Sequence, residues 1–117
     1  MGAWASRRRS SAILIIDHIE GMFEGGKKRV QGDYYDSEGR RCLWAALVDV
    51  KDEHRLQDDH PVFFCLDRAI SHYRTYGGKH SAEIIVFNDS CTSYGEMLEM
   101  LDYATKIALA RAVTLTA

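Results

Sequence analysis

The chain has 117 residues, of which 46% are hydrophobic and 27% charged, and its formal net charge is −2 at pH 7. This length suits one domain, and the composition excludes a disordered chain as well as one whose overall charge selects nucleic acid or an anionic membrane. The three cysteines, Cys42, Cys65 and Cys91, lack short paired spacings, which excludes a disulfide framework and a zinc finger. Reduced thiols in a cytoplasmic protein are the simplest interpretation.

The N-terminal segment divides into a polar tail and a helix. Residues 1–9 are expected to form a disordered tail, and residues 10–117 a single domain. The apolar run 12–16 is too short for an export signal or a membrane span. Ser10 or Ser11 is a good N-cap, and the helix should end at Gly25-Gly26. Apolar residues recur there at helical spacing: Ala12, Ile15, Ile16, Ile19, Met22 and Phe23.

The middle of the chain predicts a turn between two further helices. Residues 30–35 suit a strand or an extended loop, and Asp36-Ser37-Glu38-Gly39 is a turn by composition. An amphipathic helix is expected over 41–55. A third helix should begin at Pro61, with Asp58, Asp59 or His60 as its cap, and end at Gly77-Gly78.

The C-terminal third contains one ambiguous segment. Residues 83–87 contain three β-branched residues and a phenylalanine, which favour a strand, yet the segment also fits a short buried helix. Ser93 and Glu96 predict a capping box that opens a long helix to about residue 112. The predicted fold is therefore mainly α, with about four helices in one compact domain and room for a short two-stranded or extended β element.

Cys42 is the first candidate for chemistry, because it lies near the start of a predicted helix. The positive end of the helix dipole and the neighbouring Arg40 and Arg41 would favour a thiolate. A nucleophilic cysteine also needs a histidine base oriented by Asn88 or Asp89, and none of the five histidines has a diagnostic spacing to Cys42. Core packing is therefore the preferred interpretation of Cys42, and catalysis is the alternative.

Arg40, Asn88 and Asp89 are the candidate binding residues. The polar segment 88–93 could bind a ligand, or it could be a loop in which side-chain turns and the Ser93 cap use up the polar groups. Arg40 could pair with Asp36 or Asp89, and pairing with Asp89 would tie the turn to this segment. The histidine and aspartate spacings match no metal motif, so no metal and no cofactor are predicted.

Two motifs in the chain resemble those of a family of small uncharacterised bacterial and phage proteins, which is classed as a domain of unknown function. The first motif is Gln31-Gly32-x-Tyr34 leading into Asp36-x-x-Gly39-Arg40-x-Cys42-x-x-x-Ala46-Leu47, and the second is Ile84-x-x-Phe87-Asn88-Asp89 before a helix opened by Thr92 or Ser93. The resemblance covers residues 12–112. Ala45 stands where the family tends to have glycine. The resemblance implies a shared fold, with Gly39, Arg40, Cys42, Asn88 and Asp89 close together, and it implies no activity.

Three functions fit these residues to different degrees. The preferred one is a non-enzymatic module that binds a protein or a small ligand, with a homodimer among its forms. The first alternative is an enzyme that uses Cys42 with a histidine and Asn88 or Asp89. The second is nucleic-acid binding through Arg7–Arg9, Lys27–Arg29, Arg40 and Arg41. Acidic runs elsewhere make nucleic acid the least favoured partner, and no membrane partner is predicted.

Overall fold

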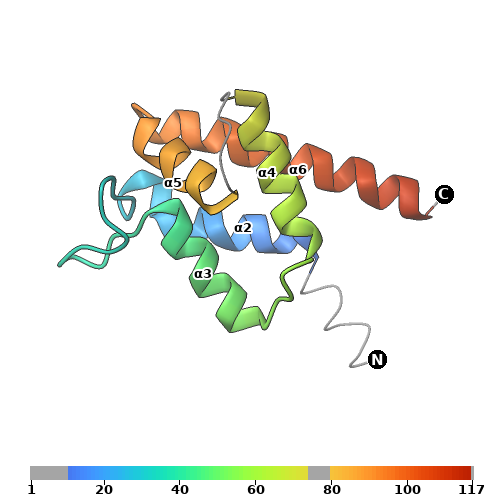
Figure 1. The fold of residues 1–117 in the computed structure, drawn as a ribbon, viewed down its shortest axis with the longest axis horizontal. Coiled ribbons are helices and arrows are strands. Elements are labelled where there is room, and N and C mark those ends of the chain that lie inside the picture. The colour runs from blue at the N-terminus through green and yellow to red at the C-terminus, as the bar shows by residue number, and fades with distance from the viewer. Residues whose placement is uncertain (1–10, 74–79, 117) are drawn as a thin grey trace.

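Helices account for nearly all the regular structure of the chain. The computed structural model describes residues 11–73 and 80–116, and within these ranges there are five α-helices and no β-strand (Figure 1). The elements are α2 (Ala12–Phe23), the short 3-10 helix η1 (Glu24–Gly26), α3 (Leu43–His54), α4 (Pro61–Tyr73), α5 (His80–Ser90) and α6 (Tyr94–Thr116). The mainly α prediction is confirmed. The helix beyond the expected four is α5, which includes the ambiguous segment 83–87.

The first helix begins and ends where the sequence predicts. Ser11 is the N-cap of α2, and its hydroxyl oxygen accepts from the N–H of Leu14 at 3.4 Å. At the other end Glu24 adopts a left-handed conformation, as residues that terminate helices often do. The tail predicted for residues 1–9 and the helix stop predicted at Gly77-Gly78 lie outside the described residues.

Two of the later helix starts refine the prediction. His60, one of three candidate caps, accepts the N–H of Val62 through Nδ1 at 3.0 Å, next to Pro61 in the first turn of α4. Before α6, the Glu96 carboxylate accepts from both the N–H and the hydroxyl of Thr92. The predicted capping box pairs this glutamate with Ser93, the residue that follows Thr92. The helix start is confirmed, and its capping bonds reach one residue further back than predicted.

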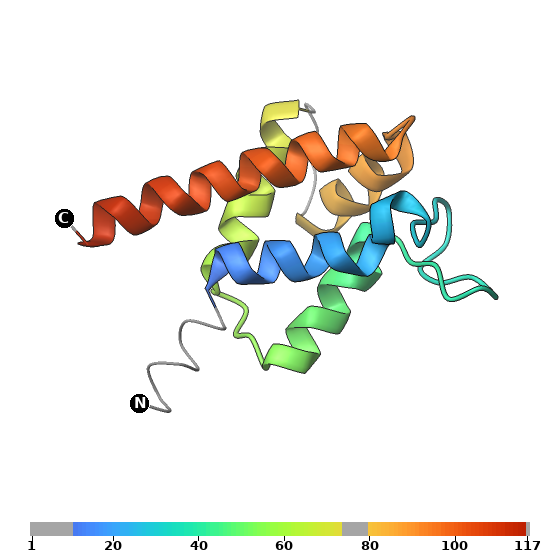
Figure 2. The same cartoon turned by 180° about the vertical axis from the view of Figure 1, so that it is seen from behind.

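The longest helix, α6, forms one side of the domain. It packs against α2 and α4, while α3 packs against α2 and α5 (Figure 2). Both views show the C-terminal part of α6 extending beyond the other helices. No helix within the described ranges is long and apolar enough to cross a membrane. The largest fully buried side chains come from all five α-helices and are Phe23, Phe87, Ile15, Ile16, Ile19, Leu43, Leu47, Leu66, Ile70, Ile84, Met97 and Met100.

The segment between η1 and α3 is a loop that projects from one end of the domain (Figure 1). Arg41 forms isolated β-bridges with Arg29 in the parallel sense and with Tyr35 in the antiparallel sense. These bridges are the extended β element that the sequence left open. Cys42 then takes an extended conformation as the N-cap of α3, which is why the helix starts at Leu43 and not at residue 41.

A substitution at Gly26 tests the contact between the end of η1 and the start of α6. The φ of Gly26 is +96°, and an added Cβ would lie 2.8 Å from Cβ of Tyr94. We expect Gly26→Ala to lower the free energy of unfolding by more than about 2 kcal/mol, through backbone strain and overlap together. Urea unfolding followed by circular dichroism measures this change.

Gly21→Ala is the matched control for that substitution. Gly21 lies inside α2 and faces solvent, and an added Cβ would meet nothing within 4 Å. Alanine should raise the free energy of unfolding there by about 0.5–1 kcal/mol. Equal stability of the two alanine variants would contradict the tight contact between Gly26 and Tyr94.

Candidate functional site

The polar turn at residues 36–39 closes on itself. Asp36 Oδ1 accepts from the backbone N–H groups of Glu38 at 3.0 Å and Arg40 at 2.8 Å, and Gly39 has the positive φ of 77° that this turn needs. The Arg40 guanidinium donates from Nε to Asp36 Oδ2 at 2.5 Å and lies 3.5 Å from Glu38. Desolvation alone would raise the pKa of Asp36, but the bonds from Arg40 and Glu38 together lower it below its ordinary value.

Of the two predicted partners of Arg40, pairing with Asp89 would have tied the turn to the segment 88–93. The structure does not show that pair. Arg40 pairs with Asp36, the other predicted partner, four residues away. The local carboxylate is already held by the turn, so it is the nearer and better oriented acceptor. The tie to the later segment is made by other residues.

Asn88 makes that tie, from the last turn of α5. Its side chain is fully buried, and Oδ1 accepts the N–H of Leu43 at 3.0 Å, which satisfies a free donor at the start of α3. Its amide nitrogen donates to the carbonyl oxygen of Val30 and to Asp89 Oδ1, both at 3.1 Å. One amide thus joins α5, the loop and α3. Each of these hydrogen bonds is needed, because an unpaired polar group is costly in a core.

The loop also caps the C-terminal end of α5. Arg29 donates to the carbonyl oxygen of Asn88 at 3.1 Å, and the Gln31 amide nitrogen lies 2.7–3.1 Å from the carbonyl oxygens of Asn88, Asp89 and Cys91. The N–H of Gly32 donates to Asp89 Oδ1 at 3.0 Å. A guanidinium and an amide here occupy the carbonyl groups that a helix end leaves free.

Asp49 fastens the loop to the side of α3. Its carboxylate accepts from Arg41 at 2.8 Å and from the hydroxyl of Tyr35 at 2.7 Å. The hydrogen bond to Asp49 raises the pKa of the Tyr35 hydroxyl above its ordinary value. The loop is therefore attached at both α5 and α3, which fixes the position of the residues between these contacts.

A pocket of about 280 Å³ lies between the loop, the start of α3 and the end of α5, the frame that these hydrogen bonds hold together. It is open to solvent and combines the loop residues, the start of α3 and the last turns of α5. Its lining residues are Gly32, Asp33, Tyr34, Cys42, Ile85, Asn88 and Asp89. Three of the residues that the sequence singled out, Cys42, Asn88 and Asp89, meet here, while Arg40 is held at the turn by Asp36. Whether any of them binds a ligand stays a prediction.

Cys42 is part of this pocket's floor. Only 4% of the residue is exposed, and Sγ accepts the N–H of Ala45 at 3.4 Å, so the thiol acts as the cap of α3. None of His18, His54, His60 and His72 lines the pocket. His18 pairs with His54, His60 caps α4, and His72 stacks on Tyr103. The predicted burial of Cys42 is confirmed.

A family model for DUF6197, a family of unknown function, matches residues 26–107. The match covers the loop, α3, α4 and α5 and most of α6, and it leaves out α2. The chain is an all-α protein of this family. No curated protein and no solved structure matches it detectably.

Asn88 provides the test of this frame. Asn88→Ala removes the acceptor for Leu43 and the donor to Val30, and we expect the free energy of unfolding to fall by about 2–4 kcal/mol. Asn88→Asp keeps an acceptor but loses the amide donor and places a carboxylate beside Asp89, so it should also destabilise. Gln57→Ala, at an exposed position, should change stability by less than about 0.5 kcal/mol. A neutral Asn88→Ala in urea unfolding would contradict the assigned role.

Proposed function

We propose that this chain is a non-enzymatic binding module and that the pocket beside Asn88 is its ligand site. The observation that carries the proposal is the contrast between the floor and the rim of the pocket. Asn88 and Cys42 are buried and held by hydrogen bonds, whereas Asp33 and Tyr34 at the rim are exposed. A fixed floor with accessible polar groups above it costs a ligand little reorganisation on binding.

The lining indicates the chemistry of the ligand. It contains two carboxylates, Asp33 and Asp89, and the ring of Tyr34, which is 55% exposed. Within the described ranges no lysine or arginine lines the pocket. Carboxylates and an aromatic face together favour a cation, through charge-assisted hydrogen bonds and the cation–π interaction. We therefore expect a small ligand that carries an amine or a related cationic group.

A protein partner is the second form of the same proposal. Tyr34, which lines the pocket, is 55% exposed, and its neighbour Tyr35 is 50% exposed. Exposed tyrosines are typical anchors of protein interfaces. A basic segment from a partner, or from a second copy of this chain, would present the same cationic chemistry to Asp33 and Asp89.

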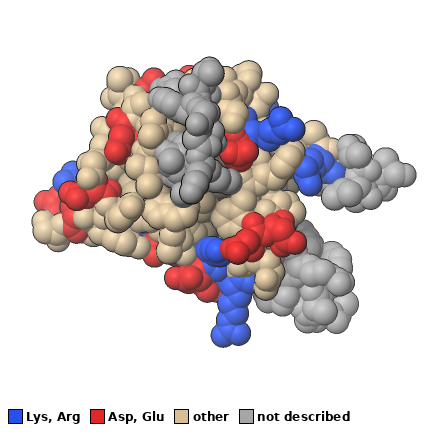
Figure 3. Space-filling view, viewed as in Figure 1, with Lys and Arg blue, Asp and Glu red and all other residues tan. Residues whose placement is uncertain are grey.

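The two alternative functions have less support. A cysteine enzyme requires a histidine beside the thiol, and Cys42 instead accepts a bond from Ala45. Of the basic residues proposed for nucleic acid, Arg29 bonds to Asn88 and Lys28 to the carbonyl oxygen of Glu38. On the face drawn in Figure 3, the described acidic and basic side chains are interspersed and form no continuous basic stripe.

Cationic probes test the ligand proposal. In ¹H–¹⁵N NMR titrations, agmatine or tetramethylammonium should produce saturable shifts at the amides of Gly32, Tyr34 and Leu43, and acetate should not. Asp33→Asn should weaken the binding of agmatine by about tenfold, through the loss of one charge-assisted hydrogen bond of about 1.5 kcal/mol.

The matched control is Asp59→Asn, which changes an exposed aspartate in the α3–α4 connection and should leave binding unchanged. If neither cation produces saturable shifts, the small-cation form of the proposal is wrong. Sedimentation analysis then tests the second form: a dimer that dissociates in Tyr34→Ala would support self-association, and a strict monomer would count against it.

Thiol labelling separates the binding module from the cysteine enzyme. In a Cys65→Ser, Cys91→Ser background, we expect native Cys42 to react with iodoacetamide at pH 7 more slowly than the same thiol in denatured protein, because it is buried and engaged with Ala45. Labelling faster than in the denatured control would favour the enzyme.

A further inference from the structure

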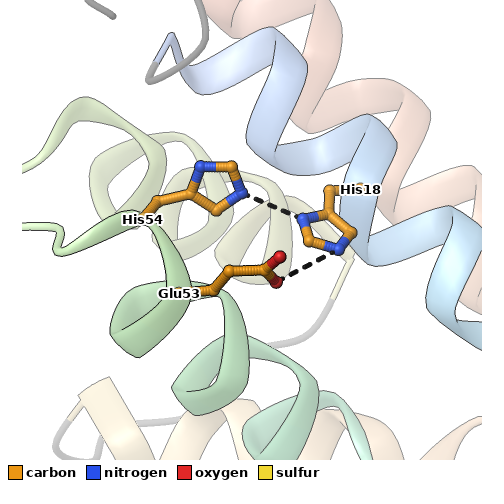
Figure 4. A group of neighbouring side chains, drawn as sticks. All are labelled: His18, Glu53 and His54. Atoms are coloured by element: carbon orange, nitrogen blue, oxygen red, sulfur yellow. Dashed lines mark hydrogen bonds and ion pairs between the residues drawn. The ribbon is translucent and has the colours of Figure 1, made fainter.

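A second group of polar side chains lies at the opposite end of α3 from the pocket. It consists of His18 from α2 and of Glu53 and His54 from the last turn of α3 (Figure 4). His18 Nδ1 lies 3.0 Å from His54 Nε2, and His18 Nε2 lies 3.6 Å from Glu53 Oε2. One ligand atom from each of the three residues lies within 4.8 Å of the other two.

Helix geometry explains why the two histidines meet. Ile15 and Ile19 are buried on the side of α2 that faces the core, and His18 lies at the edge of that stripe. Val50 is buried on α3, and His54 follows it by one helical turn on the same face. Since α2 and α3 pack together, the margins of their two apolar stripes bring the imidazoles into contact.

The group of His18, Glu53 and His54 is only partly buried, as an accessible metal site requires. The His18 side chain is 33% exposed and that of Glu53 64%, so solvent reaches the cluster from one side. Partial burial restricts the rotation of the imidazole rings and leaves the group reachable from solvent. The figure shows all three side chains converging on one region between the helices.

Two imidazoles and a carboxylate are ligands that a divalent transition metal prefers. Three such ligands with an open fourth position are the usual set of an accessible zinc site. The 3.0 Å and 3.6 Å contacts use different nitrogens of the His18 ring, Nδ1 toward His54 and Nε2 toward Glu53, so a bound ion takes only one of them. With one ligand atom from each residue, the three atoms still lie within 4.8 Å of one another, which small rotations of the side chains can bring to a tetrahedral arrangement. The negative end of the α3 dipole also favours a cation beside His54.

We propose that His18, Glu53 and His54 form a three-ligand site for a divalent transition-metal ion, with Zn²⁺ as the expected occupant. The fourth coordination position is left to water or to a group of a bound molecule. The ion joins α2 to α3. The family match over residues 26–107 includes the positions of Glu53 and His54 and does not reach His18.

Isothermal titration with ZnCl₂ on the full chain, after treatment with EDTA and its removal, tests the site. We expect one Zn²⁺ per chain and a rise in the melting temperature of about 5 °C or more at 100 times the dissociation constant. His18→Ala and His54→Ala should each weaken binding by at least about tenfold, and Glu53→Gln should weaken it by about the same factor or less.

His72→Ala is the matched control, because this imidazole stacks on Tyr103 away from the cluster and should leave zinc affinity unchanged. Circular dichroism of the metal-free variants establishes that each is folded. With Co²⁺, the native chain should show the visible bands of a four-coordinate site without thiolate charge-transfer absorption, and His18→Ala should lose these bands.

Two results would overturn the proposal. The first is the absence of measurable Zn²⁺ and Co²⁺ binding to the native chain, which would leave the three residues as a hydrogen-bonded clamp between the helices. The second is zinc binding that is equally strong in folded His18→Ala and His54→Ala, which would place the ion elsewhere.

Discussion

The fold depends on one buried side chain, the amide of Asn88. Two segments that are distant in sequence present backbone groups to this side chain: the N–H of Leu43 at the start of α3 and the carbonyl of Val30 in the loop. An amide both accepts and donates, so a single residue satisfies both kinds of group. A carboxylate or an aliphatic side chain of similar size would leave at least one of them unpaired in the core. The loop, the start of α3 and the pocket take their positions from this arrangement.

Much of the architecture could be predicted because the start and the apolar repeat of a helix are local features of the sequence. Ser11 before an apolar repeat marks the start of α2, and Pro61 marks that of α4. The segment that became part of α5 lacked such a signal. Its apolar residues are consecutive, with Ile84 and Phe87 buried while Val86 is 40% exposed, so no periodicity distinguished a helix from a strand. Its type is set by packing against α3 and α4, which no local pattern encodes.

The sites were harder to predict than the helices. The polar residues at 88 and 89 were singled out, but the partner of Asn88 is Leu43, 45 residues away and visible only as a backbone N–H. The sequence predicts both Asp36 and Asp89 as partners of Arg40, because a nearby and a distant carboxylate look equivalent in sequence, and the structure pairs it with Asp36. The group formed by His18, Glu53 and His54 was missed because metal motifs are recognised by short spacings, and His18 and His54 are 36 residues apart.

The position of α3 has a consequence for both ends of the domain. This helix begins at the pocket and ends at the histidine cluster, and its 12 residues span about 18 Å. A packed helix moves as a unit, so a displacement imposed at Cys42 is also felt at His54. Thermodynamic linkage requires the effect to be reciprocal: if occupancy at one end changes affinity at the other, the converse holds by the same factor. The two sites would then communicate through the backbone of a single helix, without any chain of polar contacts between them.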